Sequence, residues 1–103
     1  MTLELPNELT VARAAELKAL LLSALDRGEA VELSALAVSE VDVAGLQILC
    51  AARRSALARK VGFAFSPLAR SPALDQAIAA AGFGSGENER WLVEGGVEDA
   101  VHA

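Results

Sequence analysis

The chain has 103 residues, a hydrophobic content of 53% and a formal net charge of -5 with its single His neutral. These values predict one folded domain over residues 1–103 with an economical core, and they exclude most multidomain and disordered classes. The acidic balance disfavours a nucleic-acid binder, one Cys with one His disfavours a metal site, and no apolar run is long enough to insert in a bilayer, so we expect a cytoplasmic protein.

The first third of the chain predicts two short strands and a helix. Residues 2–5 and 8–11 alternate polar with apolar around Pro6 and Asn7, which is typical of a small hairpin or edge pair. The period then changes to three and four over residues 12–27, which predicts a helix with Thr10 as its N-cap and Gly28 just past its end. Its apolar side would be Ala14, Leu17, Leu21, Ala24 and Leu25.

A central strand over residues 31–38 is expected to lead into a second helix. Asp42 is its predicted N-cap and Gly62 its stop. The inward residues would be Gly45, Leu46, Leu49, Cys50, Ala52, Ala56 and Leu57, and the outward stripe would be Val43, Gln47, Ala51 and Arg54. A basic cluster, consisting of Arg53, Arg54, Arg59 and Lys60, is interpreted as a solvated face rather than a docking patch.

The last third predicts a strand at residues 63–65 and a third helix that begins after Ser71 with Pro72 at its first position. Gly82 would end this helix, with Phe83 folding back on it. Residues 90–93 are expected to add a short strand and residues 97–101 a helical turn or two. Alternating strands and helices indicate an α/β fold with crossover connections.

The most informative segment is Asp42-Val43-Ala44-Gly45-Leu46, at a helix start after a central strand. It resembles the STAS domain, a fold shared by bacterial anti-sigma factor antagonists, chemotaxis-cluster proteins and a cytoplasmic subunit of a phospholipid-transport ABC system. Relatives carry Asp, Ser or Thr, a small residue, Gly and Leu here, and the element order also fits. The resemblance implies a mixed sheet of about four to five strands covered by three to four helices.

In the antagonist branch, the Ser or Thr of this motif is phosphorylated by a partner that is a kinase and an anti-sigma factor. Val43 has no hydroxyl at that position, so the resemblance implies a binder without this phosphorylation switch, although phosphorylation of Ser39 or another hydroxyl stays open. A second departure is Ser34, where many relatives have an acidic residue. The run from Ala44 to Leu49 is most similar to chemotaxis-cluster members.

The resemblance implies a non-enzymatic module that binds a regulatory protein, and we expect the contact at the start and outer face of its second helix. The expected partner-binding residues are Asp42, Val43, Ala44, Gly45, Gln47 and Arg54. The partner would be a kinase-like anti-sigma factor or a chemotaxis component; the alternative is a transporter ATPase that the chain assists as an accessory subunit. No cofactor or catalytic residue is expected, because Asp42 lacks a companion acid or base. Homodimerisation stays open.

Each candidate residue also has a purely structural interpretation. Asp42 is adequately explained as a helix cap, and Gly45 as a site where helix and sheet approach closely. Cys50 and Trp91 are interpreted as core residues. For Gln47 and Arg54, a solvated surface and a partner contact are equally acceptable.

Overall fold

The computed structural model describes residues 1–82 and 91–92. Its strands form two sheets in which every described pairing is parallel: β1 (Thr2–Glu4), β3 (Val31–Ser34) and β5 (Phe63–Phe65) in the order β1-β3-β5, and β2 (Glu8–Leu9) with β4 (Glu40–Val41). The α/β class and the number of strands agree with expectation, whereas the sheet is divided in two. The central place of β3 is confirmed.

The expected hairpin at the N-terminus is wrong. Both strands exist, but β1 pairs with β3, with Leu3 opposite Leu33, while β2 pairs with β4, with Leu9 opposite Val41. Alternation of side chains predicts extended backbone without specifying its partner, and here each strand gains a parallel neighbour from a later segment. The pairing partner β4 was not predicted as a separate strand.

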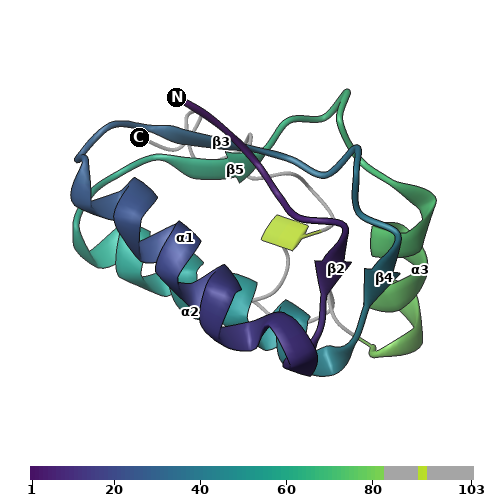
Figure 1. Ribbon diagram of the computed structural model, residues 1–103. Helices are drawn as coiled ribbons and strands as arrows, with labels where there is room; N and C mark the ends of the chain where they lie inside the picture. Colours follow the sequence, from purple (N-terminus) through teal and green to yellow (C-terminus); the bar gives the residue numbers. More distant parts are fainter. Residues whose placement is uncertain (83–90, 93–103) are drawn as a thin grey trace.

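Two helices, α1 (Ala14–Asp26) and α2 (Val43–Ala58), run side by side beneath the three-stranded sheet, and α3 (Pro72–Ala80) packs next to β4 (Figure 1). A 3-10 turn, η1 (Val11–Arg13), precedes α1. The N-cap of α3 is confirmed, because the Ser71 hydroxyl accepts from the Leu74 N–H at 3.1 Å. Gly28 and Gly82 both have a φ of 73°, the left-handed conformation expected after a helix.

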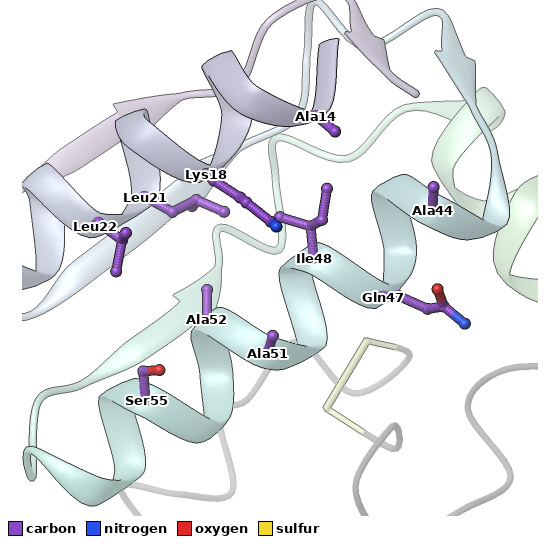
Figure 2. A pocket seen from close by; sticks show the side chains of 10 residues that line it. All are labelled: Ala14, Lys18, Leu21, Leu22, Ala44, Gln47, Ile48, Ala51, Ala52 and Ser55. Carbon is purple, nitrogen blue, oxygen red and sulfur yellow. The ribbon is translucent and has the colours of Figure 1, made fainter. Parts of the chain in front are cut away.

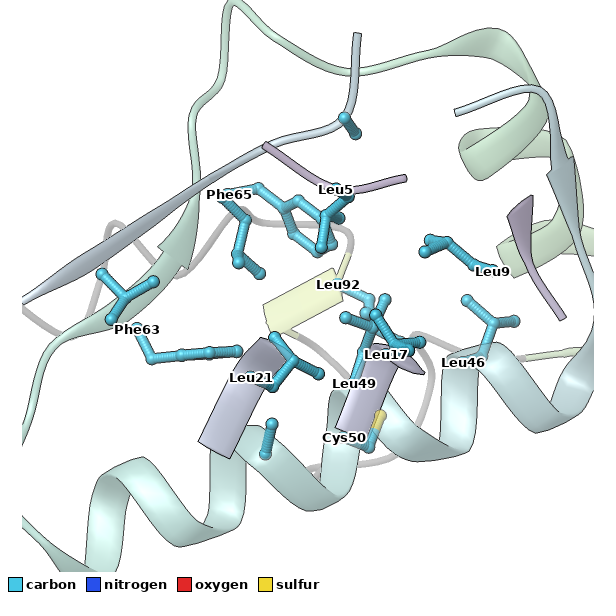
Figure 3. Close-up of a cluster of buried hydrophobic side chains, with 14 of the residues drawn as sticks. Leu5, Leu9, Leu17, Leu21, Leu46, Leu49, Cys50, Phe63, Phe65 and Leu92 are labelled. Carbon is cyan, nitrogen blue, oxygen red and sulfur yellow. The ribbon is translucent and has the colours of Figure 1, made fainter. Parts of the chain in front are cut away.

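The core lies between the sheet and the inward faces of α1 and α2 (Figure 3). It is built mainly from leucines with two phenylalanines from β5, and Trp91 stacks on Phe65 with ring centroids 5.2 Å apart. The core assignments of Cys50 and Trp91 are therefore confirmed. Most of the predicted inner faces of both helices are also buried, including Leu17, Leu21, Ala24, Leu25, Leu46, Leu49, Ala52 and Ala56, whereas Ala14 at the start of α1 is only half-buried.

Several local expectations need correction. Thr10 makes no side-chain cap, since its hydroxyl lacks a hydrogen-bond partner within the described chain. Leu57 is 57% exposed, because it lies in the last turn of α2, where no described element covers it. That helix ends at Ala58, and the left-handed residue after it is Lys60, with a φ of 59°, instead of Gly62.

The C-terminal expectations fall largely outside the described residues. Trp91 and Leu92 are helical, so the strand expected over residues 90–93 is wrong at these two positions. Phe83, the loop that follows it and the helical turn expected over residues 97–101 lie outside the described part of the chain.

Candidate functional site

The start of α2 is organised by Asp42, the residue between β4 and the helix. Its Oδ1 accepts a hydrogen bond from the Gly45 N–H at 2.9 Å, which satisfies one of the free donors in the first helical turn. The predicted cap is therefore confirmed. The cap fixes where the helix begins and so which residues of the motif face outward.

The same carboxylate also holds a second segment. Asp42 Oδ2 accepts from the Val11 N–H at 3.0 Å, and the Asp42 N–H donates to the Leu9 carbonyl at 3.1 Å. One side chain thus links the start of α2 to the start of η1, which leads into α1. The sequence does not reveal this link, because the alternation over residues 8–11 predicts a strand whose backbone donors would pair within a sheet.

These hydrogen bonds lower the pKa of Asp42. The largest effect comes from the Val11 N–H and the next from the Gly45 N–H, while partial desolvation acts in the opposite direction. A carboxylate with a depressed pKa and both oxygens engaged is ionised at neutral pH and is poorly suited to act as a general acid. The negative charge of Asp42 therefore serves to hold the fold together.

Replacing Asp42 with Ala is expected to destabilise the fold by about 1.5–3 kcal/mol, because a helix cap and a second hydrogen bond to a charged acceptor are both lost. The measurement is the free energy of unfolding in urea at pH 7. Asp42→Asn, which retains an accepting oxygen but no charge, should lose less.

The same pair of variants tests the pH dependence. Since folding lowers the pKa of Asp42, its contribution is complete above the pKa of the unfolded chain, about 4, and is lost as the pH falls through the folded value. Unfolding curves between pH 2 and 7 should therefore show a smaller loss in acid for Asp42→Asn than for the wild type. Equal losses would contradict the assignment.

Gly45 packs directly against β2. A Cβ atom at this position would lie 1.9 Å from the Leu9 carbonyl oxygen and 2.5 Å from its carbon, so only glycine fits. The interpretation of Gly45 as a close-approach residue is confirmed. Its expected direct contact with a partner needs correction, because Gly45 is buried under the chain's own backbone.

The outward stripe of α2 is observed as predicted. Val43, Gln47, Ala51 and Arg54 are all exposed, and Ala44 is half-buried. Val43 has 47% of its surface exposed, and Val11, whose N–H bonds to Asp42, has 70% exposed. Two exposed apolar residues thus lie next to Asp42 at one corner of the molecule, Val43 along the chain and Val11 through its backbone hydrogen bond. Val11 is an addition that the sequence reasoning missed.

The basic cluster does not form one solvated face. Arg53 is 5% exposed, donates to the Phe63 carbonyl and lies over the Trp91 ring, with 5.4 Å from its guanidinium carbon to the ring centroid. Arg54, Arg59 and Lys60 are exposed, and Arg59 pairs with Asp26 at 2.7 Å. Arg53 is buried because it lies on the same helical face as Leu46, Leu49 and Cys50.

An open groove lies between α1 and α2, next to this corner (Figure 2). Its volume is about 440 Å³, and its lining is mainly apolar, with Lys18 extending from α1 toward Ile48 on α2. The sequence reasoning missed it. The available signal was Leu22, an apolar residue off the inward stripe of α1, which is 49% exposed.

Within the two described segments, no group of three or more His, Cys, Asp or Glu side chains is placed to hold a metal ion. The helices of those segments include none with both the length and the apolar character required to span a membrane.

Comparison with known proteins adds one finding. A family model described as "Mlab, STAS domain" matches residues 1–94 of the chain. Neither a curated protein nor a solved structure shows significant similarity to it. The matched range includes the entire Asp42 site and both helices that border the groove.

Proposed function

The chain belongs to the STAS domain family, and from this premise we propose that it binds a regulatory protein through the start and outer face of α2. STAS domains are generally regulatory modules that interact with other proteins and are typically not enzymes. The proposal assigns the contact to Val43, with Asp42 and Ala44 at its side and Gln47 and Arg54 further along the helix. Gly45 supports this surface from below by allowing β2 to approach.

The exposure of Val43 carries this proposal. An apolar side chain with 47% of its surface in water occupies the first turn of a helix whose start is held by hydrogen bonds of Asp42 to Val11, Leu9 and the first helical turn. A rigid exposed anchor loses little conformational entropy on binding, and burial of its methyl groups favours association. Val11 enlarges the apolar surface to two side chains.

Regulation by phosphorylation at the motif position is excluded by chemistry, because Val43 has no hydroxyl to accept a phosphoryl group. We therefore propose a binder regulated by its abundance or by the state of its partner. Intact mass after incubation with a cognate kinase and ATP should show no added phosphate. A phosphate localised to Ser39, whose exposed hydroxyl donates to the Asn7 carbonyl, would overturn this part of the proposal.

Val43→Asp is expected to weaken partner binding by at least about tenfold while the domain stays folded. The added charge must be desolvated in the interface, yet it lies at the positive end of α2, where a carboxylate is tolerated. The measurement is a titration with the partner by calorimetry, with circular dichroism to confirm folding. Leu36→Asp, at an exposed loop position, is the matched control and should bind normally.

Affinity purification followed by mass spectrometry tests the class of partner. The proteins are purified from the cytoplasm, where we place the protein, and the informative ones are those that the wild type retains and Val43→Asp does not. A histidine-kinase-like anti-sigma factor or a chemotaxis component would support a signalling role. An ATPase together with a membrane permease would instead support the alternative, an accessory subunit of a phospholipid-transport system. Equal recovery of all proteins by both variants would contradict the proposed surface.

A further inference from the structure

The groove between α1 and α2 is continuous at one end with the proposed binding surface. The two helices run in the same direction, because Asp42 links the start of α2 to η1, which leads into α1, and the ion pair of Arg59 with Asp26 links their ends. Between these links the groove is lined by Ala14, Lys18, Leu21, Leu22, Ala44, Gln47, Ile48, Ala51, Ala52 and Ser55. Ala44 and Gln47 belong to both the groove and the proposed surface.

The charge of the groove is opposite to that of the chain as a whole. Lys18 is the one charged residue in its lining, and it forms no ion pair with any residue in the described segments. Arg54, exposed one turn beyond Ala51, adds a second cation nearby. The chain carries a net charge of -5, so this face favours an occupant that is apolar and acidic.

We propose that this groove accepts an amphipathic helix of the regulatory partner, with its apolar side against Leu22 and Ile48 and an Asp or Glu facing Lys18. The inference rests on the proposed function and adds the chemistry of the partner. From Ala44 to Ser55 the wall of α2 runs for about 16 Å, which accommodates three turns of a docked helix. Apolar side chains three or four residues apart on the partner helix would then pack against both α1 and α2.

Site-specific photocrosslinking tests the occupant. The full chain, with a photoreactive benzophenone amino acid in place of Leu22, is produced in its native cells and irradiated, and the crosslinked peptide is sequenced by mass spectrometry. We expect a segment of another protein with apolar residues three or four apart and an acidic residue within one turn. A peptide of this same chain, a lipid adduct or the absence of any adduct would each overturn the inference. The same probe at Leu36 is the control.

Charge reversal then tests the ion pair, with a synthetic peptide of the captured segment as the probe. Lys18→Glu should weaken its binding by about tenfold or more, and a peptide with its acidic residue changed to Lys should recover most of the loss. Lys60→Glu, an equal change beyond the end of α2, should have no effect. Unchanged affinity for Lys18→Glu, or failure of the swapped peptide to recover binding, would overturn the inference.

The outcomes for the two proposals are separable when the whole partner is used. If Val43→Asp weakens binding and Lys18→Glu does not, the partner uses the α2 start without the groove, so the proposed function stands and this inference fails. If neither variant weakens binding, both fail. Loss of binding in both variants, with folding retained, supports both.

Discussion

Gly45→Ala is expected to destabilise the domain by about 3–5 kcal/mol, the largest effect that we expect among alanine substitutions at the described glycines. The new Cβ would lie 1.9 Å from the Leu9 carbonyl oxygen, far inside van der Waals contact, and the obstacle is backbone that cannot rotate away. The better helix propensity of Ala offsets only about 1 kcal/mol. The cost should appear as a lower urea midpoint.

The consequences of this change extend to the binding site. Leu9 also accepts from the Asp42 N–H, so displacing β2 disturbs the segment that positions Val43. Gly62→Ala is the matched control, because its Cβ would lie 3.2 Å from the Ala30 Cβ, a tight contact that small shifts relieve. A Gly45→Ala protein as stable as Gly62→Ala would show that β2 does not pack on α2 as described.

Arg53→Ala is expected to cost about 2–4 kcal/mol and to shift the fluorescence of the single Trp to longer wavelength. The change removes a charged donor to the Phe63 carbonyl, a cation over the Trp91 ring and the buried stem of the side chain. The Trp91 ring would lose its contact with Arg53 and become more exposed to water. Urea unfolding and the emission maximum measure the two effects.

The neighbouring residue provides an internal control. Arg54→Ala removes the same side chain from the outward stripe and should change stability by no more than about 0.5 kcal/mol, with Trp emission unaltered. Arg53→Met should lie between the two, because it retains the apolar stem. Equal stability of the two alanine variants would show that Arg53 lies on the solvated face that the sequence pattern suggested.

Much of the local structure could be predicted because its determinants lie within a few residues. The caps at Asp42 and Ser71, the left-handed Gly28 and Gly82 and the inner face of α2 all depend on spacings of three or four along the chain. The motif at residues 42–46 also sufficed to predict the family. The exposure of Val43 followed from its place on the outward stripe.

Other features depended on contacts between distant segments, which residue spacing does not encode. The pairing of β1 with β3 and of β2 with β4 required knowledge of which extended segments meet. Arg53 was misplaced because its charge suggested solvent, whereas its position on the helix, its carbonyl acceptor and the Trp91 ring allow it to be buried. The groove was missed because a groove belongs to two helices at once.

By itself, the sequence determined that the chain is an α/β domain of the STAS family, where its second helix begins, and that the motif position lacks a hydroxyl. The tertiary structure alone decided that the Asp42 carboxylate joins two helix starts and that Gly45 faces the backbone of Leu9. The physical reason is range: periodicity and capping act within one turn, while packing and hydrogen bonds between segments depend on the folded path of the whole chain.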